Sequence, residues 1–497
     1  MSKHFPYPAS WALAQKLGYL ASESEIIYRA GISLSDLLDA QRFLGEGTIL
    51  SVVDPATFEA RLEEIFHQNT GESQQIAQDI DQSVDLFSLT EEMPESEDLL
   101  NEESAAPVIR LINAILSEAT KEGASDIHIE TYEKKMSIRF RVDGVLRTIL
   151  QPNKKLAALL ISRIKVMAKL DIAEKRIPQD GRIALRIGRR NIDVRVSTLP
   201  SLYGERAVLR LLDKNSLQLS LDALGMSQAD HQSLQELIQC PHGIILVTGP
   251  TGSGKSTTLY AILSALNTPG RNILTVEDPV EYELEGIGQT QVNMRVDMSF
   301  ARGLRAILRQ DPDVVMVGEI RDTETAQIAV QASLTGHLVL STLHTNSATG
   351  AVTRLRDMGV EPFLLSSSLV GVLAQRLVRR LCPACRIQKP LMPQQAALLQ
   401  SHQLKASHVW LPVGCPACRE TGYQGRLAMH ELMLITPALR AAIHANANEQ
   451  TIEQIVRQQH RSLIENGLQK AIEGDTSFEE VLRVASEISH ATQEEEE

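Results

Sequence analysis

The chain has 497 residues, of which 43% are hydrophobic and 22% are charged, as in globular proteins of about two to four domains. Its formal net charge is −13 and only 4% of its residues are aromatic, which argues against a general nucleic-acid binder, since such proteins carry basic surfaces and stacking aromatic rings. The chain opens without a signal-peptide pattern and holds no run of about 18 apolar residues, so we expect a cytoplasmic protein that reaches a membrane only through partners.

The N-terminal part of the chain carries little readable chemistry. Residues 1–80 mix helical patterns without a motif, and we interpret them as a small domain that binds a partner. Residues 81–104 contain nine acidic residues and neither lysine nor arginine. This composition predicts a flexible linker, because like charges repel one another along the chain.

Residues 105–215 show the alternating patterns of a compact α/β domain. Asp143-Gly144 is a hairpin turn signal after a strand-like stretch, and a second hairpin is expected to turn near Gly188. The expected elements are a helix over 108–116, strands over 125–130 and 138–142, a helix over 154–170 and a hairpin over 182–197.

Residues 220–380 predict a doubly wound nucleotide-binding core, because strand and helix patterns alternate there. Gly243–Thr248 is almost continuously apolar, as expected for a parallel strand covered on both faces. Similar strands are expected over 272–276, 313–317 and 337–342. The most apolar window, Phe363–Val378, is interrupted by Gln375 and Arg376, and we interpret it as a buried helix.

A complete phosphate-binding loop follows the first of these strands and precedes a predicted helix. Glycines let backbone N–H groups approach phosphates, Lys255 can reach the β- and γ-phosphates, and the hydroxyl of Ser256 can hold Mg²⁺. The residues predicted to bind ATP here are Gly249, Pro250, Thr251, Gly252, Ser253, Gly254, Lys255, Ser256 and Thr257.

Carboxylates and histidines at the ends of later strands supply what hydrolysis needs beyond phosphate binding. Glu319 follows an apolar strand, and we expect it to act as general base or to orient the attacking water. Glu277 ends the second strand, and Glu281 behind it is either a site residue or a helix cap. His337 and His344 flank the fourth strand, and each taken alone is more simply a structural histidine.

Four of the five cysteines form two C-x-x-C pairs separated by 29 residues. Two such knuckles typically converge on one tetrahedral structural zinc ion that has no open position for catalysis. The predicted ligands are Cys382, Cys385, Cys415 and Cys418. The fifth, Cys240, is interpreted as a free thiol without a role.

The C-terminal third is divided by these cysteines. Residues 381–428 form the predicted zinc-binding module, and residues 429–490 form a predicted helical subdomain. Residues 491–497 are expected to be a disordered acidic tail.

Over about residues 95–490 these motifs together resemble one family, the secretion-superfamily traffic ATPases, and within it the type II secretion ATPases. The stretches that carry the resemblance are Ser125–Glu130, Arg141–Arg147, Ile177–Arg182, Gly204–Arg206, Gly249–Ser256, Val276–Pro279, Arg302–Asp322, Thr335–Asn346, the two cysteine pairs, Gly422–Arg426 and His430-Glu431.

The resemblance implies a RecA-like P-loop core preceded by a PAS-like α/β domain, with the ATP site between the two. It implies a homo-hexamer that hydrolyses ATP to assemble a pseudopilus at the cytoplasmic face of the inner membrane, and so drives protein export. It also implies that residues 1–80 dock on the cytoplasmic domain of a bitopic L-type membrane protein, and that a polytopic inner-membrane platform protein is a second partner.

The same resemblance suggests roles for individual residues. It puts Glu277 in an aspartate box, Glu319 in an atypical Walker B segment, and His337 and His344 in a histidine box. Without it, the arginines of the chain read individually as solvated surface cations. The arginines at positions that the family uses around the phosphates are Arg195, Arg210, Arg305, Arg309 and Arg321.

Three other functions compete with this interpretation. A type IV pilus assembly ATPase shares the core and the cysteine pairs, but such proteins usually have a longer N-terminal region. A nucleic-acid motor is disfavoured by the net charge of −13 and the few aromatic residues. A scaffold that binds ATP without hydrolysing it is disfavoured by the presence of both Lys255 and Glu319.

Overall fold

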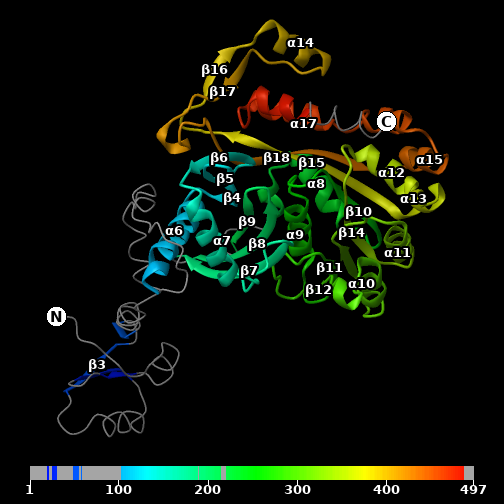
Figure 1. Ribbon diagram of the computed structural model, residues 1–497. Helices are drawn as coiled ribbons and strands as arrows, with labels where there is room; N and C mark the ends of the chain where they lie inside the picture. Colours follow the sequence, from blue (N-terminus) through cyan, green and yellow to red (C-terminus); the bar gives the residue numbers. More distant parts are fainter. Residues whose placement is uncertain are drawn as a thin grey trace. The chain divides into compact units, whose positions relative to one another are not determined.

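The computed structural model describes residues 19–21, 25–30, 49–54, 57–58, 102–187, 190–213 and 220–485 (Figure 1). The chain divides into two compact units, Met1–Asn215 and Ser216–Glu497, and each is described by itself. The predicted linker over 81–104 lies almost wholly outside the described residues, and so does the acidic tail over 491–497.

Within residues 1–80 the described residues form one small sheet. Its strands are β1 (Tyr19–Ala21), β2 (Glu25–Arg29) and β3 (Ile49–Val53), in the order β1-β2-β3. β1 runs antiparallel to β2, and β3 runs parallel to it.

The rest of the first unit is a six-stranded antiparallel sheet with two helices on one face. The strand order is β6-β5-β4-β9-β8-β7, and α6 and α7 pack on it through Leu111, Leu160 and Ile127 among others. Both predicted helices, and a turn at Asp143-Gly144 between β5 and β6, are confirmed. The elements are α6 (Glu102–Lys121), β4 (Ala124–Thr131), β5 (Met136–Val142), β6 (Val145–Leu150), α7 (Lys155–Met167), β7 (Gln179–Ile187), β8 (Arg190–Ser201) and β9 (Gly204–Asp213).

The second unit is built on a seven-stranded sheet in the order β12-β11-β13-β14-β10-β15-β18. The first six strands are parallel, and β18 pairs with β15 in the antiparallel direction. All four predicted strands of the core are present. The strands are β10 (Gly243–Thr248), β11 (Ile273–Glu277), β12 (Gly288–Gln291), β13 (Val314–Val317), β14 (Leu338–Leu343), β15 (Leu369–Leu381) and β18 (Tyr423–Leu434).

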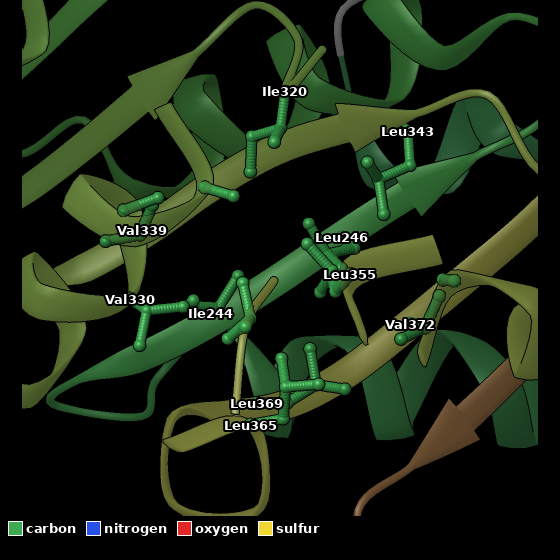
Figure 2. Packing of buried hydrophobic residues seen from close by; sticks show 14 of the residues in the cluster. Ile244, Leu246, Ile320, Val330, Val339, Leu343, Leu355, Leu365, Leu369 and Val372 are labelled. Atoms are coloured by element: carbon green, nitrogen blue, oxygen red, sulfur yellow. The ribbon is translucent and has the colours of Figure 1, made fainter. Parts of the chain in front are cut away.

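Helices cover both faces of this sheet, as the unbroken apolar strands predict. Along β10, Ile244 and Leu246 face the core shared with α10–α13, while Ile245 and Val247 face the core shared with α8 and α9. Figure 2 shows the first of these cores, with Leu355 close to Leu246. The helices are α8 (Gln228–Leu237), α9 (Lys255–Leu266), α10 (Phe300–Ile307), α11 (Thr323–Leu334), α12 (Ala348–Asp357) and α13 (Pro362–Ser368), with short 3-10 turns at Leu221–Leu224 and Met294–Val296.

One sequence prediction in this core is wrong. The window Phe363–Val378 is not a single buried helix, because α13 ends at Ser368 and the long strand β15 begins at Leu369. A strand buried on both faces and a buried helix are both continuously apolar, so periodicity cannot separate them. Here β15 pairs along its edges with β10 and β18, and its two faces are buried in separate cores, with Val372 in one and Leu373 in the other.

The C-terminal part returns to the sheet after the cysteine segment. A short antiparallel pair, β16 (Ile387–Pro390) and β17 (His408–Leu411), and a 3-10 turn at Pro416–Cys418 lie between β15 and β18. None of the described helices is long and apolar enough to cross a membrane. The remaining helices are α14 (Pro393–Ser401), α15 (Pro437–His444), α16 (Glu449–Val456) and α17 (Leu463–Glu473).

Candidate nucleotide and metal sites

The predicted phosphate loop lies where β10 ends and α9 begins, at the carboxyl edge of the sheet. Gly249 and Gly254 have φ angles of 149° and 90°, which L side chains rarely adopt. A Cβ atom on Gly249 would also lie 2.5 Å from the carbonyl oxygen of Gln375. The loop is therefore a backbone structure that glycine alone permits, and it presents the N-terminus of α9 to an anion.

Lys255 is the first residue of α9 and folds over the loop. Its Nζ donates hydrogen bonds to the carbonyl oxygens of Gly249, at 2.6 Å, and Pro250, at 3.0 Å. Burial and, to a smaller extent, the charge of Arg376 lower the pKa of Lys255 to about 8, against the opposing effect of Glu319. The ammonium group is thus held at the loop, close to a carboxylate and to a second cation.

Glu319 follows β13, and its negative charge acts on Lys255. Its side chain is only 13% exposed. Arg321 Nη2 lies 2.5 Å from Glu319 Oε1, and His344 Nε2 lies 3.5 Å from Glu319 Oε2. Burial and the charge of Lys255 lower the pKa of His344, against the raising effect of Glu319. The neutral imidazole is therefore favoured beside the carboxylate. The structure brings Lys255, Glu319, Arg321 and His344 together.

Glu277 ends the neighbouring strand β11, but its carboxylate is buried in hydrogen bonds. It accepts from the phenol of Tyr260, from Thr275 Oγ1 at 2.5 Å and from Gln289 Nε2 at 3.1 Å. Burial and the bond to Glu277 raise the pKa of Tyr260. The phenol oxygen also accepts the backbone N–H of Glu281 at 3.2 Å. Glu277 therefore joins α9 to the segment after β11.

Three other predicted residues lie in different surroundings. Arg305 on α10 pairs with Glu324 at 2.5 Å, and Arg309 Nη1 donates to the backbone oxygen of Arg305 at 2.8 Å. His337 precedes β14, and its Nδ1 lies 2.9 Å from the backbone oxygen of Ala332. Because β10 and β14 are parallel and Gly243 pairs with Leu338, His337 lies at the amino edge of the sheet, opposite the phosphate loop. The structure does not bring His337 to the site of Lys255.

Arg195 and Arg210 belong to the first unit and are direct cross-strand neighbours on β8 and β9. Arg182 on β7 pairs with Arg195 in the same row. Arg210 is 57% exposed, and its Nε lies 2.9 Å from Asp126 Oδ1. The row lies on the face away from α6 and α7, because the alternate residues, such as Val194, are buried in the core.

The four predicted zinc ligands converge. Their sulfur atoms all lie within 4.8 Å of one another. The Sγ–Sγ distances are 3.9 Å for Cys382 and Cys415 and 3.7 Å for Cys385 and Cys418. Tetrahedral zinc–thiolate bonds of about 2.3 Å require sulfur separations of about 3.8 Å. The backbone N–H groups of Cys415 and Gly422 each donate to Cys418 Sγ at 3.2 Å, as expected for a thiolate knuckle. The donor set fits one zinc ion.

Sequence reasoning missed two residues that shape the nucleotide site. Tyr260 reads as one more apolar residue of a buried helix, and nothing local predicts its bond to Glu277. Gln375 did carry a signal, because a fully buried amide in an apolar run needs partners. Those partners, Ser253 and Thr258, are visible only once β15 is known to lie beside β10.

Comparison with known proteins agrees with this arrangement. The family profile described as "Type II/IV secretion system protein" matches residues 101–483. A protein of Escherichia coli (strain K12) named "Putative type II secretion system protein E" is 79% identical over 486 residues, 98% of this chain and 99% of that protein. The "Type II secretion system ATPase E" of Vibrio cholerae is 60% identical over 467 residues, 94% of this chain and 93% of that protein.

Two solved structures share the fold. The pilus retraction motor PilT with bound ADP has a TM-score of 0.52 and 28% identity, and the match covers 74% of this chain and 95% of that one. The ATPase DotB of Legionella pneumophila has a TM-score of 0.57, and the match covers 79% of this chain and 98% of that one. Its identity is 22%, so this second similarity supports the fold alone.

Proposed function

This chain belongs to the type II/IV secretion system protein family, and we propose that it is the ATP hydrolase that drives pseudopilus assembly and protein export in a type II secretion system. The observation that carries the proposal is the meeting of Lys255, Glu319 and His344 beside a complete phosphate loop. The full-length similarity to proteins named for type II secretion favours this system over type IV pilus assembly.

The proposed mechanism uses the geometry of the loop. The backbone N–H groups and Lys255 bind the phosphate oxygens of ATP, for which Lys255 leaves the carbonyls of Gly249 and Pro250. Glu319 orients the attacking water and accepts its proton, with Arg321 and His344 holding the carboxylate in place. Ser256 is exposed in the first turn of α9, so its hydroxyl fits a Mg²⁺ ligand. Bound Mg²⁺ neutralises phosphate charge.

Arginines would supply further positive charge to neutralise the phosphates of ATP. Like charges on directly opposite residues destabilise a sheet, so the row that includes Arg195 and Arg210 fits a binding surface for an anion. We propose that these two arginines meet the phosphates of ATP in a homo-hexamer, and that Arg305 and Arg309 are released toward nucleotide from their present contacts. Glu277 is proposed as a residue that positions α9, through Tyr260, rather than as a direct base.

The cysteine cluster is proposed to hold one structural zinc ion. Its four sulfurs have the spacing of a closed tetrahedral site, which leaves no position for substrate. When bound, the metal would tie the end of β15 to the start of β18, because the two cysteine pairs border these strands.

Partners and location follow from the proposed system. Residues 1–80 are proposed to dock on the cytoplasmic domain of a bitopic L-type membrane protein, with a polytopic platform protein as the second partner. The chain would then work at the cytoplasmic face of the inner membrane. The limits of the N-terminal domain and the linker are proposed as the sequence predicts them, but the predicted limit between the zinc module and the helical subdomain, after residue 428, falls inside β18.

Complementation of a secretion defect tests the proposal. In cells that lack this chain, the wild-type protein is expected to restore export of the extracellular proteins of the system, and Glu319→Gln is not. The matched control is Glu473→Gln, which changes an exposed glutamate on α17 whose partner is Gln469. Restored surface pili with no change in export would favour the pilus-assembly alternative.

A further inference from the structure

Strand β15 runs beside the phosphate loop and carries one buried amide there. Thr248, the last residue of β10, pairs with Ala374 of β15, so Gln375 lies level with Gly249. The Gln375 side chain is 1% exposed. An amide buried this completely costs free energy unless both of its ends are hydrogen-bonded.

Both ends of this amide are bonded to the nucleotide-binding segment. Gln375 Nε2 donates to the backbone oxygen of Ser253 at 2.8 Å. Gln375 Oε1 accepts from Thr258 Oγ1, also at 2.8 Å, and Thr258 is 2% exposed. One side chain therefore joins the middle of the loop and the first turn of α9 to the neighbouring strand.

The surroundings leave the loop little freedom to move away from this contact. A Cβ atom on Gly254 would lie 3.0 Å from Gln375 Nε2, so the amide packs against the glycine as well as bonding to the loop. The next residue, Arg376, donates from Nη2 to Asn346 Oδ1 at 2.8 Å, two residues beyond His344. Consecutive residues of β15 thus hold the phosphate loop and the segment that carries His344.

We propose that Gln375 is a positioning residue of the ATP site, which holds the loop so that its backbone N–H groups face the phosphates. The inference rests on the proposed ATP hydrolysis. Without the amide, the carbonyl of Ser253 and the hydroxyl of Thr258 lose their described partner while remaining buried. The loop would then shift to find new partners, and its N–H groups would lose their common direction.

The test compares two nucleotides that differ in phosphate. The full-length chain and Gln375→Leu are titrated with ADP and with AMP, because a loop that cradles the β-phosphate matters mainly for ADP. We expect ADP to bind Gln375→Leu roughly threefold to tenfold more weakly, the effect of one neutral hydrogen bond, with AMP unchanged. Gln388→Leu, on the exposed strand β16, is the matched control and keeps the wild-type preference for ADP.

A second pair of variants covers the case in which Gln375→Leu does not fold. Thr258→Val removes the hydroxyl that donates to Gln375 Oε1, and Thr258→Ser keeps it. We expect Thr258→Val to reduce the preference for ADP over AMP and Thr258→Ser to retain it. The unfolding temperature of each variant, measured without nucleotide, shows whether its fold is intact. A purely structural role would lower the unfolding temperature and leave the ratio of ADP to AMP affinity unchanged.

Two failures are distinguishable. If folded Gln375→Leu and Thr258→Val both keep the wild-type preference for ADP, the positioning role is wrong. The proposed function fails in a different case. If the wild-type chain does not prefer ADP to AMP, or if Lys255→Ala leaves that preference unchanged, the phosphate loop does not bind nucleotide.

Discussion

The phenol of Tyr260 on α9 donates a hydrogen bond to the buried carboxylate of Glu277 at the end of β11. The helix that begins at the phosphate loop is thereby fixed to the next strand of the sheet. The same phenol oxygen accepts the backbone N–H groups of Glu281 and Tyr282, so the segment after β11 is held by the same contact. Glu277 is 4% exposed, so its carboxylate is shielded from water and the loss of a hydrogen-bond donor costs free energy.

Tyr260→Phe is therefore expected to destabilise the chain. The substitution leaves Glu277 with Thr275 and Gln289 as donors and removes the phenol oxygen, to which the backbone N–H groups of Glu281 and Tyr282 donate. We expect a loss of about 1–3 kcal/mol in the free energy of unfolding, measured by urea denaturation. Tyr203→Phe, on the half-exposed β8–β9 turn, is the control and should change little. Equal stability of Tyr260→Phe and wild type would show that the bond to Glu277 contributes nothing.

Glu319→Gln separates binding from turnover. The amide keeps the size of the side chain but cannot accept a proton from water, so we expect ATP to bind with near-wild-type affinity. Phosphate release should fall by about 10²–10⁴-fold, the usual contribution of a general base. Binding is measured with a fluorescent ATP analogue and turnover by released phosphate. Wild-type turnover in this variant would exclude Glu319 as the base.

The sequence could predict that residues after different strands lie at one edge of the sheet, because parallel strands bring their carboxyl ends together. Glu319 and His344 follow two different strands, and the fold alone places both beside Lys255. His337 is close to His344 in sequence, but the six-residue strand β14 separates them by roughly 20 Å. The motif therefore pointed to both His337 and His344, but it did not show that they lie at opposite edges of the sheet.

The sequence could not predict the contacts that depend on which strands are neighbours in the sheet. Gln375 acts on Ser253 across more than a hundred residues of chain, because β15 pairs directly with β10. No local pattern fixes that pairing, and the apolar run Phe363–Val378 did not even distinguish a strand from a helix. Tyr260 and Glu277 meet for the same reason, across the space between a helix and the adjacent strand.

The lowered pKa of Lys255 predicts a pH dependence of nucleotide affinity. Burial brings this pKa from 10.5 to about 8, so the free site loses its ammonium charge as the pH rises above 8. When a phosphate binds, Lys255 takes up a proton from solution and its ammonium charge is restored. ADP affinity should then fall by up to about tenfold per pH unit above 8, the limit for one linked proton. The measurement is a calorimetric titration at several pH values between about 7.5 and 9.5.

The control for this dependence is Lys255→Met, which removes the titrating group and retains most of the side-chain volume. It should bind ADP weakly at every pH and show no slope above pH 8. The same slope in wild type and variant would mean that another group causes the dependence. His344 does not interfere, because its pKa is lowered from 6.5 and it is already neutral in this range.

Metal analysis tests the cysteine cluster independently of catalysis. We expect gently purified chain to contain one zinc ion, and Cys415→Ser to lose most of it, because a closed tetrahedral site needs all four sulfurs. Removal of the metal by a chelator should lower the unfolding temperature, since Cys382 directly follows β15 and the second cysteine pair precedes β18. Cys240→Ser is the matched control, because Cys240 packs against the hydrophobic core and is not part of the cluster. Full zinc content in Cys415→Ser, or none in the wild type, would rule out a four-cysteine site.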